Sequence, residues 1–288
     1  LCEGVTAEFV DAGHLLGSAC IVVDAEEDGE KRRIVFSGDL GNVDQPIIRD
    51  PSEISGADYV VMESTYGDRD RKDVWSYTDE LAQIIDETIA AGGNVLIPAY
   101  AVGRTQEMLY YLREIKNEGL VKGHANFPVY VDSPLADNST SVFLQCDKDF
   151  LDEESQYIMD LGVNPLVFPG LTTTQSVDES RAINADPNPK VILSASGMCE
   201  AGRVRHHLKH NLWREDSTIL FVGYQTEGTL GRKLLNGADY VKMFGEEITV
   251  NANILEIDGI SGATLTTNGY KSGVGKALEA VKIMEGVA

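Results

Sequence analysis

Three side chains in the first 70 residues stand where they could hold a metal ion or move a proton. His14 lies in a turn of small residues, Asp39 follows a run of apolar residues, and Glu63 follows the next such run. Histidine and aspartate flanked by glycines, which let the backbone approach closely, are residue types that zinc prefers. A single histidine at a strand end more often has a structural role. Three such ends on one edge of a sheet predict a shared site.

The apolar pattern supplies the elements that would position these side chains. Short β-branched runs indicate strands, and apolar residues at helical spacing indicate helices. From residue 57 to 132 the order strand, helix, strand, helix, strand is typical of a parallel α/β unit. The predicted strands are 21–23, 34–36, 57–62, 95–98, 127–132, 190–193 and 218–222, and the predicted helices are 74–91 and 105–116, with a helical acidic stretch around 140–160.

Composition restricts the class of protein. The 288 residues are 43% hydrophobic and 24% charged, which favours a packed α/β protein over a disordered one. The net charge of −22 disfavours a protein that coats nucleic acid, but it leaves room for a nuclease with local phosphate contacts. The sequence contains no apolar run of membrane-spanning length. Four cysteines without CxxC spacing predict a reducing cytoplasm rather than a disulfide framework or a zinc ribbon.

Several motifs in order make residues 7–258 resemble a known family. The sequence is similar to the β-CASP branch of the metallo-β-lactamase superfamily, which comprises zinc-dependent RNA-processing nucleases. Many matches at sensible spacing are far more specific than any one of them. The motifs are residues 12–18, 37–41, 63–69, 97–107, 131–136, 194–198 with Gly202 and Arg203, and 221–231.

The resemblance implies a fold and a division into domains. We expect an α/β protein in which residues 1–70 and 190–258 form part of a metallo-β-lactamase αββα sandwich. A parallel α/β β-CASP domain would be inserted at residues 71–189, and residues 259–288 would form an atypical tail. The chain starts at Leu1 in strand-like sequence, which is typical of a chain entered within a domain.

The resemblance also implies roles for individual residues. His14 would be a zinc ligand and Asp39 would bridge two zinc ions. Glu63 would be a catalytic-site acid that orients a neighbouring histidine. RNA phosphates would be held by side chains of the β-CASP domain and of the segments facing it. These are Arg104, Ser133, Ser196 and Arg203, for which structural salt bridges (the arginines) and turn capping (the serines) stay open as alternatives.

Three departures from the family pattern lower the expected number of metal ligands. The family's first metal motif, His-x-His-x-Asp-His, is absent, and so is its last metal histidine. Ala263 stands where the family has its catalytic histidine. His124, His206, His207 and His210 do not occupy ligand positions, and we expect them to be solvated or packed residues. We therefore expect weak zinc binding and no nuclease activity in this chain.

The final segment has a resemblance of its own. Residues 258–269 are similar to the flavin-attachment motif of FMN-binding domains in ion-translocating electron-transfer complexes, where the threonine matching Thr264 carries FMN. The sequence Asp-Gly-Ile-Ser-Gly can occur in both families, so the two resemblances meet at one shared motif. A misjoined coding sequence, a functional fusion and a plain C-terminal helix with Ala277, Leu278, Val281 and Met284 inward all stay open.

Together these observations predict a zinc-dependent RNA hydrolase, an exo- or endoribonuclease, that is incomplete and inactive as this chain. A non-catalytic RNA-binding scaffold and a fragment that carries covalent FMN are the alternatives. We expect RNA as the partner, no membrane association and a cytoplasmic location, and a homodimer stays open. Zinc, two ions in the family, and FMN are the cofactors at issue.

Overall fold

The computed structural model describes residues 2–65 and 77–257 of this chain, and these fall into two compact units. The first unit comprises residues 2–65 together with the short segment 149–153, and the second comprises residues 77–148 and 154–257. Strands and helices alternate in the second unit, which confirms the predicted mixed α/β fold. No helix in the described part of the chain is long and apolar enough to cross a membrane.

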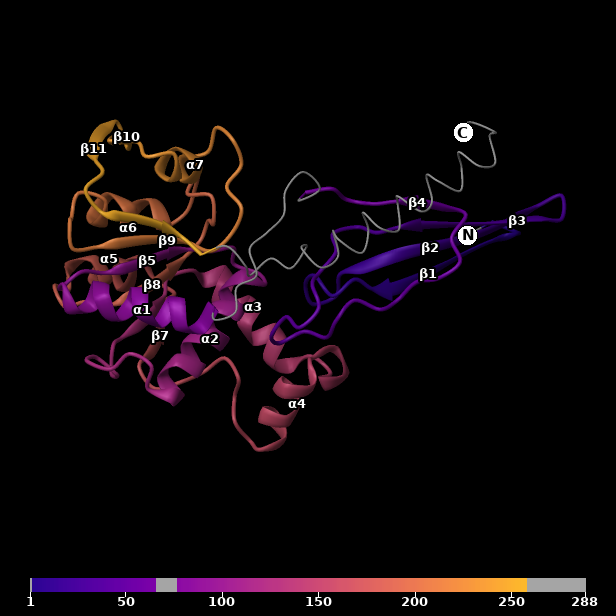
Figure 1. The fold of residues 1–288 in the computed structure, drawn as a ribbon, viewed down its shortest axis with the longest axis horizontal. Coiled ribbons are helices and arrows are strands. Elements are labelled where there is room, and N and C mark those ends of the chain that lie inside the picture. The colour runs from indigo at the N-terminus through magenta and orange to yellow at the C-terminus, as the bar shows by residue number, and fades with distance from the viewer. Residues whose placement is uncertain (1, 66–76, 258–288) are drawn as a thin grey trace, which may run out of the picture. The chain divides into compact units, whose positions relative to one another are not determined.

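The first unit is built on a four-stranded sheet in the order β1-β2-β3-β4 (Figure 1). Its strands are β1 (Val5–Asp11), β2 (Ala19–Glu27), β3 (Glu30–Phe36) and β4 (Tyr59–Val61). The first three are antiparallel neighbours, and β4 runs parallel to β3. Between β2 and β3 lies a two-residue hairpin loop in which Asp28 and Gly29 have φ of 52° and 82°, a conformation that favours an Asp-Gly pair.

The pairing of these strands brings the predicted site loops to one edge of the sheet. Asp11, the last residue of β1, pairs with Ala19, the first residue of β2. Phe36 and Val61, the last residues of β3 and β4, pair with each other. The ends of β1, β3 and β4 therefore lie at the same edge, as the sequence predicts.

One face of this sheet carries an exposed apolar row. The register aligns Phe9, Ile21, Phe36 and Val61 across all four strands. Their side chains are 73%, 37%, 40% and 55% exposed.

The second unit contains a six-stranded parallel sheet in the order β12-β9-β5-β8-β6-β7. A separate antiparallel pair, β10 (Tyr240–Met243) and β11 (Glu246–Thr249), belongs to the same unit. The strands of the large sheet are β5 (Val95–Pro98), β6 (Val129–Val131), β7 (Leu171–Thr173), β8 (Val191–Ser194), β9 (Thr218–Phe221) and β12 (Asn253–Glu256).

Helices cover both faces of this sheet (Figure 1). On one face, α6 and α7 pack over Leu96, Ile192 and Ile219 to form an apolar core. On the other face lie α1 and α2, whose inward residues are fully buried. The helices are α1 (Tyr77–Ala90), α2 (Arg104–Glu118), α3 (Pro134–Gln145), α4 (Glu153–Asp160), α5 (Val177–Ala185), α6 (Val204–Asn211) and α7 (Leu230–Leu235), with a 3₁₀ turn at Lys148–Phe150.

The division into units differs from the expected domains. The sequence groups residues 190–258 with residues 1–70, whereas β8, β9 and β12 join the sheet of residues 77–189. The reason is strand pairing, because β8 lies between β5 and β6, and β9 lies between β5 and β12. The predicted tail, residues 259–288, lies outside the described residues, as does Thr264 within it.

Candidate functional site

Two groups of residues carry the candidate chemistry, one in each unit. The first group stands at the strand-end edge of the four-stranded sheet and contains His14, Asp39 and Glu63. The second group stands at the carboxyl ends of the parallel strands and is centred on Asp132. Edges of this kind are where α/β sheets place their sites.

The loops that carry His14 and Asp39 touch each other through their backbones. The Gly41 N–H donates to the Ala12 carbonyl oxygen at 2.8 Å. A Cβ at Gly41 would lie 1.6 Å from the Gly13 carbonyl oxygen, so only glycine permits this approach. Within the first loop, the backbone N–H of His14 donates to the Ser18 hydroxyl at 3.1 Å. The two predicted zinc ligands therefore stand on adjoining loops.

Glu63 is tied to the Asp39 loop. Its Oε1 accepts a hydrogen bond from the Leu40 N–H at 2.8 Å, and its Oε2 accepts one from the Thr65 hydroxyl at 2.6 Å. Asp39 itself is exposed. The structure thus brings Glu63 to the backbone next to Asp39.

These residues do not by themselves fit the two-zinc centre that the resemblance implies. Within residues 2–65 and 77–257, no group of three or more His, Cys, Asp or Glu side chains is arranged to hold a metal ion. A zinc site takes three or four protein ligands, and His14 and Asp39 are two. Ala263, at the position of the family's catalytic histidine, lies outside the described residues.

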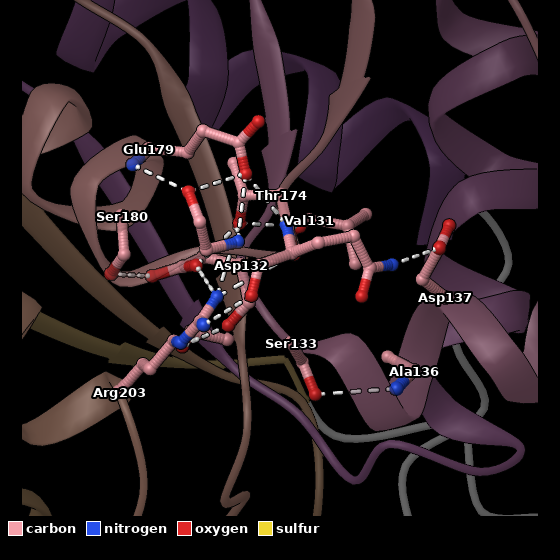
Figure 2. A network of polar contacts seen from close by, with 12 residues as sticks. Val131, Asp132, Ser133, Ala136, Asp137, Thr174, Glu179, Ser180 and Arg203 are labelled. Carbon is pink, nitrogen blue, oxygen red and sulfur yellow. Dashed lines mark hydrogen bonds and ion pairs between the residues drawn. The ribbon is translucent and has the colours of Figure 1, made fainter.

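Asp132 is the centre of a buried polar network in the second unit. It follows β6 directly and is 0% exposed. Its carboxylate accepts hydrogen bonds from the Thr174 hydroxyl at 2.5 Å and the Ser180 hydroxyl at 2.6 Å. The Arg203 guanidinium donates to it at 2.8 Å. Figure 2 shows Thr174, Ser180 and Arg203 converging on this carboxylate.

His207 supplies the fourth partner of Asp132. Its Nε2 lies 2.6 Å from Asp132 Oδ2, and its Nδ1 lies 2.8 Å from Asn184 Oδ1. Arg203 precedes α6 and His207 lies four residues on, so both side chains fall on the same side of the helix start. A carboxylate that is fully desolvated is stable only with partners of this kind.

The environment of Asp132 favours its charged form. Burial alone would raise the pKa of this carboxyl group. The hydrogen bonds from His207, Ser180 and Thr174 outweigh burial and hold the pKa of Asp132 well below its usual range. Asp132 therefore stays ionised and keeps its four donors bound.

The four predicted phosphate-binding residues differ in how far their polar groups are engaged. Arg203 is bound to Asp132, and its Nη2 donates to the Gln175 carbonyl oxygen at 2.7 Å. Ser133 caps α3, its hydroxyl accepting from the Ala136 N–H at 3.2 Å, and Figure 2 shows it turned toward Ala136. Structural roles, which the sequence left open, are therefore present for both.

Arg104 and Ser196 are less fully engaged. Arg104 pairs through Nη1 with Glu107 Oε2 at 2.6 Å, and its side chain is 11% exposed. Gly223 lies beside it, since a Cβ there would be 3.9 Å from Arg104 Nε. The Ser196 hydroxyl receives the Ala201 N–H at 3.5 Å, a long contact. Counting only contacts within residues 2–65 and 77–257, Arg104 and Ser196 keep more polar groups for a ligand than Arg203 and Ser133 do.

Sequence reasoning missed the network around Asp132. Thr174, Ser180 and His207 lie 42, 48 and 75 residues away along the chain. The available signal was Asp132 itself, a carboxylate directly after a buried strand. The helical spacing of Arg203 and His207 was a second signal.

Comparison with known proteins finds one domain family and several named proteins to which this chain is similar. Residues 105–234 match the Beta-Casp domain family. The chain is 38% identical over 256 residues to Ribonuclease TTHA0252 of Thermus thermophilus, covering 88% of this chain and 57% of that protein. It is 32% identical over 259 residues to an RNase J-like protein of Methanocaldococcus jannaschii, covering 89% of this chain and 58% of that protein.

A further relative has a different kind of name. The chain is 32% identical over 263 residues to the Transcription termination factor FttA of Methanocaldococcus jannaschii, covering 88% of this chain and 40% of that protein. The chain thus spans between 40% and 58% of the length of these three relatives. In addition, residues 211–279 match the FMN-binding domain family, and residues 258–279 of that match lie outside the described part.

Proposed function

We propose that this chain belongs to the β-CASP family of RNA-processing nucleases and that it binds RNA. The activity of that family would be zinc-dependent hydrolysis of RNA phosphodiesters. We further propose that this 288-residue chain by itself holds zinc weakly and cleaves RNA poorly or not at all. The observation that supports this proposal is the edge where His14 and Asp39 stand on adjoining loops, with no third metal ligand grouped with them among the described residues.

The polar groups left on Arg104 and Ser196 support RNA binding. An arginine can grip a phosphate with two parallel hydrogen bonds, so a few local contacts suffice in an acidic chain. Both residues lie beyond the carboxyl ends of parallel strands. Arg104 is the first residue of α2, which follows β5, and Ser196 lies in the loop after β8. Arg203 and Ser133, whose polar groups are engaged inside the domain, would act by holding these segments in place.

A non-catalytic RNA-binding role is the first alternative. One relative is named a transcription termination factor rather than a ribonuclease. Both functions leave RNA intact with this chain at any zinc concentration. They differ for a chain that also carries the family's other metal ligands, which would cleave RNA in the first case and leave it intact in the second. The choice between exo- and endonuclease action would follow from the products of 5′-labelled and internally labelled RNA.

The test combines zinc content with RNA cleavage by the purified chain. We expect zinc to be lost on dialysis and a labelled single-stranded RNA to stay intact with or without added zinc. Asp39→Asn serves as the matched control, since it removes a predicted ligand from an exposed position. Near-stoichiometric zinc that only a strong chelator removes, with cleavage that Asp39→Asn abolishes, would contradict the proposal of an inactive chain.

We propose a cellular location and an assembly state for this chain. We infer a reducing, cytoplasmic compartment from the four cysteines, Cys2, Cys20, Cys146 and Cys199, which are all free. A homodimer is the assembly to test, by light scattering on the purified chain. A disulfide in protein isolated from its native host would contradict the compartment.

Covalent FMN attachment is a second candidate function, favoured by the match of residues 211–279 to the FMN-binding domain family. Thr264 would be the attachment residue, and it lies outside the described part of the chain. Intact mass after co-expression with a flavin-transferring enzyme tests this. A gain of one FMN that Thr264→Val removes supports it, and an unchanged mass excludes it.

A further inference from the structure

Glu63 uses both oxygens of its carboxylate inside the protein. Oε1 accepts from the Leu40 backbone N–H at 2.8 Å, and Oε2 accepts from the Thr65 hydroxyl at 2.6 Å. The first of these contacts spans 23 residues of sequence and joins the loop after β3 to the loop after β4.

The backbone of Glu63 is fixed to the same loop. Its N–H donates to the Ser37 hydroxyl oxygen at 3.1 Å, and this hydroxyl donates in turn to the Gly38 carbonyl oxygen at 2.7 Å. The Ser37 N–H donates to the Val61 carbonyl oxygen at 2.9 Å. The pairing of β3 with β4 is thus continued beyond the strands by side-chain contacts, and it ends at Leu40.

Asp39 stands between two residues that these contacts hold. Gly38 precedes it with φ of 55°, and Leu40 follows it with its N–H bound to Glu63. The next residue, Gly41, donates its N–H to Ala12 in the loop of His14. Whatever fixes Leu40 therefore fixes both the position of Asp39 and its spacing from the His14 loop.

We propose that Glu63 is a positioning residue, which fixes the backbone that presents Asp39 by accepting the Leu40 N–H. It does so through its geometry and not by exchanging a proton. The role of Asp39 itself rests on the proposed function, whereas the Glu63–Leu40 contact does not. Groups that take part in chemistry need their supporting backbone held in this way.

Two substitutions separate geometry from charge. Glu63→Gln removes the charge and keeps an oxygen that can accept the Leu40 N–H. Glu63→Asp keeps the charge, but its side chain is one methylene shorter and cannot reach Leu40 and Thr65 together. A positioning role predicts that Gln preserves the contact and Asp loses it. A role for the charge or for proton exchange predicts the opposite order.

The readout is hydrogen exchange at the Leu40 amide, followed by NMR in the full 288-residue chain without RNA or added metal. We expect exchange within about threefold of the parent chain for Glu63→Gln and roughly tenfold or more faster for Glu63→Asp. The Ser37 amide, which bonds to Val61, is the internal reference and should not change. Glu53→Gln, at an exposed carboxylate of the same unit, is the control variant.

The opposite order of Gln and Asp, or unchanged Leu40 exchange in both variants, would overturn the proposal. Faster exchange at Leu40 and Ser37 together in Glu63→Asp would also overturn it, because the strand pair and not the Asp39 loop would then depend on Glu63. Since the experiment uses neither RNA nor zinc, a failure to bind RNA contradicts the proposed function and leaves this result standing.

Discussion

His207 Nε2 lies 2.6 Å from Asp132 Oδ2, and both side chains are fully excluded from solvent. The two residues are 75 positions apart in the sequence. Their contact joins α6 to the end of β6, and Arg203 joins the same carboxylate from the start of α6. The carboxyl-end loops of the parallel sheet are therefore held by one buried charge and its donors.

Replacing Asp132 by asparagine should destabilise the protein strongly. The variant removes the charge and leaves Arg203 and His207 without their carboxylate, and breaking a buried pair in this way costs about 3–5 kcal/mol. Urea unfolding measures the change in the free energy of unfolding. Asp178→Asn is the control, because that side chain is 93% exposed and its ion pair with Arg181 is 3.6 Å long. Equal stability of the two variants would contradict the conclusion that Asp132 holds the buried polar network together.

The same carboxylate should make stability depend on acid pH. The hydrogen bonds to Asp132 overcome the effect of burial and lower its pKa in the folded protein. Its contribution is therefore complete above the unfolded pKa, about 3.9, and is lost as pH falls toward the folded pKa. We expect the free energy of unfolding of the parent chain to decline below about pH 5 more steeply than that of Asp132→Asn. Parallel pH profiles would count against this.

Two adjacent histidines provide a sharp comparison. His207 is 0% exposed, whereas its neighbour His206 is exposed and stacks on Phe244 with 4.6 Å between ring centroids. His207→Ala removes a donor to Asp132 and leaves a cavity, so we expect a loss of roughly 2–4 kcal/mol. His206→Ala should cost well under about 1 kcal/mol. Thermal unfolding of both variants checks this, and similar melting temperatures would refute it.

The two arginines should separate RNA binding from stability. Lysine keeps the charge of arginine but lacks its planar fork. We expect Arg104→Lys to weaken binding of a single-stranded RNA about fivefold or more, with its ion pair to Glu107 retained. Arg203→Lys should instead lower stability and leave RNA affinity within about twofold, since Arg203 is bound to Asp132 and Gln175. Fluorescence anisotropy and urea unfolding measure the two effects, and the reverse assignment would contradict the site.

Local patterns predicted most elements of the fold. The buried strand β5 and helices α1 and α2 lie where apolar spacing places them. Local patterns did not predict that the strands of residues 190–257 join the parallel sheet of the second unit. β8 and β9 are short apolar runs, and nothing within them specifies that their partners are β5 and β6, which lie far away in the sequence.

The candidate site was predictable to the same limited extent. Strand ends carrying His14, Asp39 and Glu63 do meet at one edge, because pairing between neighbouring strands is a local matter. The Asp132 network is assembled from single polar residues such as Thr174 and Ser180. Each of these looks ordinary in sequence and acquires its role only from the fold.

The most direct test of the account is an anisotropy titration of a labelled single-stranded RNA with the 288-residue chain, in EDTA and in added zinc. We predict that the RNA binds with equal affinity in EDTA and in added zinc, and that it is intact at the end of each titration. Arg104→Lys should bind the RNA more weakly in both conditions. No binding at low salt would contradict the proposed RNA-binding function. Binding that requires zinc and ends in cleaved RNA would contradict the proposal that this chain holds zinc weakly and does not cleave RNA.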